Sequence, residues 1–97
     1  MEAKKELAQT QNIENVLKER GSNYGEYAVV CEITELMKDA MKKGSNWSSL
    51  DDSAKVGLFF ICNKIARCVN GKMTKDSLVD IQGYAKLIET QSKSVKE

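Results

Sequence analysis

The sequence contains no histidine and no proline, and each absence narrows what the chain can do. Without histidine, the commonest general base and metal ligand is missing, so any chemistry must come from other polar side chains. Without proline, glycine marks the breaks between stretches of helical periodicity. The three cysteines are odd in number and are not spaced as paired metal ligands. They are therefore interpreted as buried, reduced thiols of a cytoplasmic protein.

The sequence also lacks an excess of charge and a long apolar run. Fifteen Lys and Arg residues against fourteen Asp and Glu residues give a net charge of +1. A strongly basic footprint is what sequence-independent nucleic-acid binding requires, so duplex DNA or RNA is not an expected partner. No apolar stretch approaches the roughly 18 residues of a membrane span, and the N-terminus lacks the apolar core of a signal peptide. We expect no membrane partner.

What is present is helical periodicity, which predicts an all-α fold. Cations before Gly44, at 42 and 43, are typical of a helix end, and Ser49 and Thr74 are typical of helix starts. We expect a small antiparallel bundle of about four helices, in one domain over residues 12–91. Residues 1–11 are an N-terminal extension, helical or frayed, and residues 92–97 are a solvated tail. The four predicted helices cover 12–20, 26–43, 50–70 and 75–91.

The predicted third helix is apolar over more than half of its circumference. The pattern indicates either the central helix of a bundle or a helix shared with another subunit. Because such a helix is covered more easily if neighbouring chains contribute, we expect a homo-oligomer, with a bundle of four unassociated helices as the alternative.

The fourth predicted helix carries an acidic residue, Asp80, within its apolar arc. An isolated buried carboxylate is very costly, so Asp80 needs cationic partners. Lys64 and Arg67 are the nearest candidates, because the third and fourth helices are joined by a short turn at Gly71. One interpretation is a structural ion pair. The other is an anion site, in which Arg67 grips a phosphate, Lys64 acts as a point charge and Asp80 orders both.

Aromatic residues beside these charges extend the second interpretation. Tyr24 lies in a glycine-rich loop, Gly21 to Gly25, where it could stack on a nucleobase. Trp47 lies in a similar loop, but packing of that loop onto the core is the favoured interpretation there. Tyr84 lies one helical turn after Asp80. The candidate ligand-binding residues are therefore Tyr24, Lys64, Arg67, Asp80 and Tyr84.

Two acidic pairs provide an alternative metal site. Glu32 and Glu35 share a helix face and could hold Mg²⁺ if Asp76 and Asp80 faced them. The first pair points away from the apolar side of its own helix, which favours a solvated acidic face. These four residues would then meet only across a subunit interface.

Several spaced motifs resemble those of a widespread family of small phage-encoded helical proteins of unknown function. They run from about residue 13 to 90, and they imply a phage origin and action in the cytoplasm of the infected bacterial host. The motifs are Arg20-Gly21-Ser22-x-Tyr24-Gly25, Trp47, Lys64-Ile65-Ala66-Arg67, Asn70-Gly71, Asp76-Ser77 and Asp80-Ile81-x-Gly83-Tyr84-Ala85-Lys86-Leu87.

A more distant resemblance is to MazG-like all-α nucleotide pyrophosphohydrolases, which bind Mg²⁺ through acidic pairs on two helices. Glu32 and Glu35 match the first pair, whereas Asp76 and Asp80 match the second only loosely, because their spacing is four rather than three. In size, origin and ligand chemistry, the chain is also similar to small phage proteins that sequester cyclic nucleotide signals of bacterial immunity.

The leading hypothesis is a non-catalytic binder that sequesters a cyclic mononucleotide or dinucleotide without a cofactor. A Mg²⁺-dependent nucleoside triphosphate pyrophosphohydrolase is the alternative. A third possibility is a protein–protein inhibitor of a host enzyme, acting through the acidic face of the second helix.

Overall fold

The computed structural model describes the backbone of residues 2–97 and the side chains of residues 12–97. Over this range the chain is all-α and has no strand, as predicted. Four α-helices are joined by short connections, one of which contains a single 3-10 turn, η1, at Trp47–Ser49. The helices are α1 (Glu2–Tyr24), α2 (Tyr27–Met41), α3 (Asp52–Asn70) and α4 (Lys75–Gln91).

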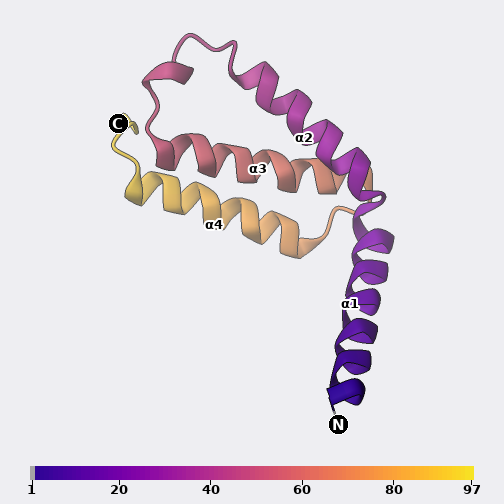
Figure 1. Cartoon of the computed structure of the whole chain (residues 1–97). Helices are drawn as coiled ribbons and strands as arrows, with labels where there is room; N and C mark the ends of the chain where they lie inside the picture. Colours follow the sequence, from indigo (N-terminus) through magenta and orange to yellow (C-terminus); the bar gives the residue numbers. More distant parts are fainter. Residues whose placement is uncertain (1) are drawn as a thin grey trace.

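The helix α3 is the centre of the fold. It packs against α2 on one side and α4 on the other, so the three helices form a flat layer with α3 in the middle (Figure 1). Four of the seven buried side chains in the described residues are on α3 and are small, so the core is thin. They are Ala54, Cys62, Ala66 and Cys68, and the other three are Val30 and Thr34 of α2 and Ser77 of α4.

The helix α1 leaves this layer and projects away from it (Figure 1). Only its C-terminal part contacts α2 and α3. The molecule is consequently elongated, with dimensions of 56 × 26 × 23 Å and a radius of gyration of 17.0 Å. A compact domain of this length would have a radius of gyration of about 12.5 Å.

The predicted boundaries of the first helix were wrong at its end, for a clear reason. Gly21 was expected to break the helix, but it continues to Tyr24, and Gly25 is the residue with positive φ (77°). Glycine within a helix costs only about 1 kcal/mol relative to alanine, which is not enough to stop it. The helix ends where the backbone enters the left-handed region, which favours glycine.

The starts of α3 and α4 are fixed by side-chain caps. Thr74 accepts a hydrogen bond from the Ser77 amide, which confirms the predicted start of α4. The N-cap of α3 is Asp51 and not the predicted Ser49. The Asp51 carboxylate accepts a hydrogen bond from the Ala54 amide at 3.0 Å. Ser49 instead ends the 3-10 turn. An aspartate cap also places a negative charge at the positive end of the helix.

The tail after α4 has no regular structure, but it is bound to the start of α3. Lys93 donates its amide to Asp51 Oδ2 at 2.7 Å, and Ser92 donates its hydroxyl to Asp51 Oδ1 at 2.9 Å. In return, the Asp51 amide donates to the Ser94 hydroxyl at 2.8 Å. We call these three interactions the tail contact.

Among the described residues, no helix is both long and apolar enough to cross a bilayer.

Candidate functional site

The end of α3 is where three helices meet, and glycine makes that meeting possible. The backbone of Gly71 passes so close to Asn23 and Tyr24 of α1 that a Cβ atom on Gly71 would collide with their backbone atoms. The Lys72 amide donates to the Asn23 carbonyl across this crossing. The side-chain amide of Asn70 donates to the carbonyls of Tyr24 (2.8 Å) and Glu26 (3.3 Å). The α1–α2 turn is therefore fixed against the last residue of α3.

This junction leaves a cavity of about 570 Å³. Sites for small organic ligands are typically about 300–1,000 Å³. Its lining combines two guanidinium groups and two phenol rings with an apolar base, and we call it the arginine–tyrosine cavity. The lining residues are Leu17, Arg20, Gly21, Tyr24, Gly25, Glu26, Tyr27, Val30 and Arg67.

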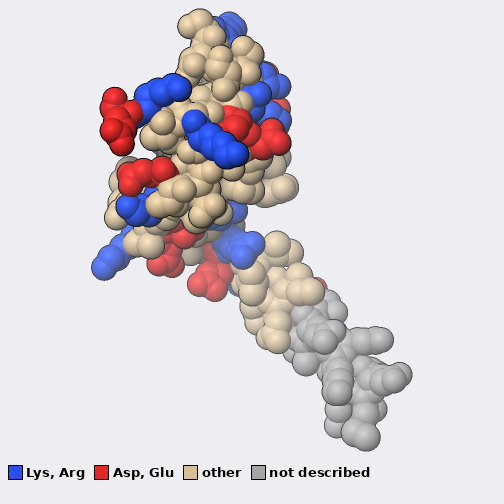
Figure 2. All heavy atoms as spheres, turned by 90° about the vertical axis from the view of Figure 1, so that its left-hand side faces the viewer, with Lys and Arg blue, Asp and Glu red and all other residues tan. Residues whose placement is uncertain are grey.

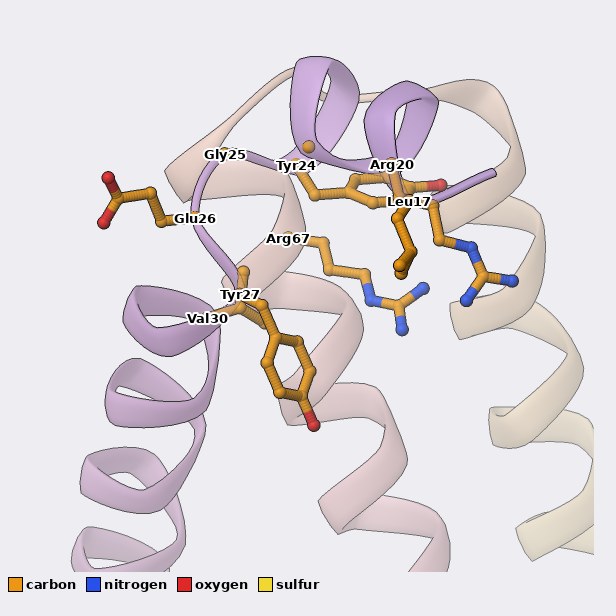
Figure 3. A pocket seen from close by; sticks show the side chains of 9 residues that line it. Leu17, Arg20, Tyr24, Gly25, Glu26, Tyr27, Val30 and Arg67 are labelled. Atoms are coloured by element: carbon orange, nitrogen blue, oxygen red, sulfur yellow. The ribbon is translucent and has the colours of Figure 1, made fainter. Parts of the chain in front are cut away.

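The cavity places cationic and aromatic side chains beside one another (Figure 3). Arg67 reaches from α3 into its centre and lies 5.0 Å from the centroid of the Tyr24 ring, a cation–π contact. Within residues 12–97, neither Arg20 nor Arg67 forms an ion pair with a carboxylate. Glu26 also lines the cavity, but its carboxylate is directed away from the arginines in this view.

Tyr27 forms the far wall and is 80% exposed. A hydrogen bond with the neighbouring Cys31 thiol raises the pKa of the Tyr27 phenol, with smaller contributions from the charge of Cys31 and from burial. The positive charge of Arg67 acts in the opposite direction, as the weakest of these influences. Tyr27 therefore stays neutral at physiological pH and can stack on a ligand or donate a hydrogen bond to it.

The structure separates the predicted ligand-binding residues into three places. Tyr24 and Arg67 are together in the cavity. Lys64 forms an ion pair with Asp80 at 2.9 Å, outside the lining of that cavity. Tyr84 stacks on Phe60 with ring centroids 5.1 Å apart. These two rings border a smaller hollow of about 240 Å³ between α3 and α4.

The expected burial of Asp80 was wrong. Its partner is Lys64, as one interpretation proposed, but the Asp80 side chain is 48% exposed. The expectation assumed a compact bundle, in which the apolar arc of α4 would face a core on both sides. Because α4 packs mainly against α3, part of that arc faces solvent, and Asp80 lies in that part. The Lys64–Asp80 pair is consequently a half-exposed structural ion pair and has no pocket of its own.

The alternative magnesium site is not assembled within one chain. Glu32 and Glu35 are exposed on α2, Asp76 and Asp80 are exposed on α4, and α3 lies between the two helices (Figure 1). Among the side chains that the structure describes, no three acidic or thiol groups are close enough to hold a metal ion. The Cys62 thiol is also unsuited to chemistry, because burial raises its pKa.

Charged side chains of both signs are interspersed over the face shown in Figure 2, so that face has no extended patch of one sign. Three polar residues of the site, Arg20, Glu26 and Tyr27, were not predicted as ligand-binding residues. Arg20 follows Leu17 by three residues, and Tyr24 follows Arg20 by four, so the three share one face of a helix. This spacing was a usable signal, but it was hidden by the assumption that the helix ended at Gly21.

The fold and the site together define a small all-α protein with a cavity lined by arginine and tyrosine side chains at a helix junction. Residues 7–92 match the model of a protein family described as a domain of unknown function, DUF6378. The chain belongs to this family. No curated protein and no solved structure matches it.

Proposed function

We propose that the arginine–tyrosine cavity binds a phosphorylated nucleotide without transforming it. The observation that carries this proposal is the placement of two guanidinium groups, unpaired within residues 12–97, beside two tyrosine rings in one cavity. A guanidinium group can bind two phosphate oxygens at once, and a phenol ring can stack on any nucleobase. The base would lie against Tyr24 or Tyr27, and the phosphate against Arg20 and Arg67.

The charge of the cavity favours a phosphodiester over a triphosphate. Two arginines and one carboxylate line it, which leaves a net charge of +1. A nucleoside triphosphate carries about four negative charges, which proteins usually neutralise with several cations and Mg²⁺. A cyclic mononucleotide or cyclic dinucleotide carries one negative charge per phosphodiester, which two arginines can match. By charge, a cyclic nucleotide thus fits the cavity better than a nucleoside triphosphate does.

The chemistry of the lining favours binding over catalysis. Beyond its arginines, the cavity offers two neutral phenols, one outward-directed carboxylate and apolar side chains. None of these is an activated nucleophile placed beside a base. A phage protein of this kind, abundant in the cytoplasm of an infected bacterium, would lower the free concentration of a cyclic nucleotide immune signal by holding it intact.

Isothermal titration calorimetry tests this proposal. The panel is cyclic mononucleotides, cyclic dinucleotides, the corresponding linear nucleotides and inorganic phosphate, at tens of micromolar protein. We expect heat from at least one cyclic nucleotide, and chromatography of the released ligand should recover it unchanged. An absence of heat from the whole panel, or recovery of a hydrolysed product, would refute the proposal.

Two substitutions localise the binding. Arg67→Gln removes a charge-assisted contact worth about 1.5–3 kcal/mol, so affinity should fall by about tenfold or more. Lys64→Gln removes a cation of similar length from the same helix, outside the cavity, and is the matched control. It should bind as the wild type does. Equal losses in the two variants would place the phosphate near Lys64 instead, and thermal unfolding checks that both variants fold.

A further inference from the structure

The described part of α1 presents an uncovered apolar stripe. Ile13, Val16 and Leu17 follow one another at helical spacing and are 59%, 45% and 62% exposed. The helix projects from the layer of α2, α3 and α4 (Figure 1). In most proteins an apolar stripe of this kind faces a core, and tertiary packing supplies most of a helix's stability. Within residues 12–97, the side chains of Ile13, Val16 and Leu17 have no such cover.

The exposed area of the chain exceeds that expected of a compact monomer. Its accessible surface is 7536 Å², whereas a monomer of 10.8 kDa is expected to expose about 5,500 Å². The excess is about 2,000 Å². A standard protein–protein interface removes about 800 Å² from each partner. Pairing through α1 alone would thus account for a substantial share of the excess.

The charges of this helix match those of a second copy of itself. Glu14, Lys18, Glu19 and Arg20 sum to zero, so two such helices do not repel each other. In an antiparallel pair centred on Leu17, Glu14 of one copy is level with Arg20 of the other, so that Arg20 would be shared between this carboxylate and the phosphate, and Arg67 would be the unshared cation of the cavity. A parallel pair would instead set like charges level with each other.

The same register supplies a place for an apolar side chain. In the antiparallel pair, Ile13 of one copy is level with Gly21 of the other. Gly21 has no side chain, and a Cβ atom built on it would have nothing within 4 Å. This open space lies on the wall of the arginine–tyrosine cavity, since Gly21 and Leu17 both line it.

From these observations we infer that two copies of the chain pair antiparallel through α1, and that the second copy's α1 forms the missing wall of the cavity. Ile13 of each copy fills the space beside Gly21 of the other. The pairing itself stands on the stripe, the exposed area and the charges, whereas the closing of the cavity rests on the proposed function.

Molar mass in solution tests the pairing. Light scattering on a sizing column should give the wild type at least twice the chain mass of 10.8 kDa. Ile13→Glu puts a charge in the stripe without altering a residue that lines the cavity of its own chain, and should halve that mass. Leu36→Glu, at a residue of α2 with 62% exposure, is the matched control and should leave the mass unchanged. A monomeric wild type, an unaltered Ile13→Glu protein or an equal loss in the control would overturn the pairing.

Ligand binding by the same variants tests the closing of the cavity. If a cyclic nucleotide binds the wild type, Ile13→Glu should weaken binding by about tenfold, and Leu36→Glu should not. Unchanged affinity in a monomeric Ile13→Glu protein would overturn the shared cavity while leaving the proposed function intact. If no nucleotide binds any of the proteins, the proposed function and the shared cavity both fail, and the mass measurements still decide the pairing.

Discussion

The two ends of α3 differ in how their charged side chains are partnered. At its start, Asp51 caps the helix and takes up the tail, so that its carboxylate accepts hydrogen bonds from Ala54, Ser92 and Lys93. At its end, Asn70 fixes the α1–α2 turn by two hydrogen bonds to backbone carbonyls. Near Asn70, however, Arg67 contacts the Tyr24 ring and lines the cavity, and it forms no ion pair with a carboxylate of residues 12–97.

The two ends differ in whether the charged side chain has a partner in the same chain. The charge of Asp51 is satisfied by groups of the same chain. The guanidinium groups of Arg20 and Arg67 have no acidic partner in residues 12–97, although exposed carboxylates are common elsewhere on the surface. An unpaired charge beside a cavity indicates a ligand site more strongly than an ion pair does, because a pair is already neutral.

The largest effect on stability should come from disturbing the helix junction beside the cavity. Gly71→Ala places a methyl group against the backbone of Asn23 and Tyr24, which cannot move as a flexible side chain would. We expect a loss of about 1–3 kcal/mol in the free energy of unfolding, measured by urea denaturation.

Gly83→Ala is the matched control for this substitution. Gly83 is within α4, and a Cβ atom there would meet nothing within 4 Å. Alanine should therefore stabilise the helix by up to about 1 kcal/mol. Equal stabilities of the two variants would show that the crossing of Gly71 and α1 does not persist in solution.

A smaller effect, dependent on pH, should come from the start of α3. Hydrogen bonds from the Ala54 amide, then the Lys93 amide, then the Ser92 hydroxyl hold the pKa of Asp51 below its ordinary value of 3.8. Because the folded-state pKa is depressed, the stabilisation is complete above the ordinary value and is lost as the pH falls through the folded one. Asp51→Ala should therefore lower the urea midpoint at pH 7 and lower it less at pH 3.

The neighbouring Asp52→Ala variant controls for the loss of a negative charge near the helix start. Asp52 is exposed and is not the cap. A variant truncated after Gln91 should reproduce part of the Asp51→Ala effect, since it removes the tail contact but keeps the cap. A truncated chain as stable as the full chain would show that the tail contact contributes nothing.

The smallest effect on stability should come from substituting Lys64 and Asp80, whose ion pair lies between the two ends of α3. The pair is 2.9 Å apart, but Asp80 is 48% exposed, and pairs of this kind contribute about 0–1 kcal/mol. A double-mutant cycle with Lys64→Gln and Asp80→Asn should give a coupling energy in this range. A coupling above about 2 kcal/mol would mean that an assembly buries the pair.

The helices were predictable from the sequence because their signals are local. Thr74 starts α4, and the periodicity of residues 50–70 indicates a central helix, without reference to the rest of the chain. The arrangement of the helices was not local. Whether Asp80 is buried depends on how many neighbours α4 has, and its periodicity alone could not reveal that α3 is its main neighbour.

The site was half predictable for the same reason. Tyr24 and Arg67 were identified as ligand-binding candidates by residue type and position, and the structure brings them together. Lys64 was assigned to the same site because the short turn at Gly71 was expected to bring both cations of the third helix near Asp80, but Lys64 is three residues from Arg67. That spacing leaves the two side chains pointing apart by about 60° on the helix, one toward α4 and the other toward α1. Sequence proximity could not decide between those directions.

The single tryptophan of the chain gives the two ends of α3 separate optical signals. Trp47 begins the 3-10 turn just before Asp51, with the Lys55 amine 5.7 Å from its ring centroid. Tyr24 and Tyr27 are in the lining of the cavity at the far end. Emission excited at 295 nm should therefore follow release of the tail, whereas difference absorbance of the phenols should follow a ligand entering beside Arg67.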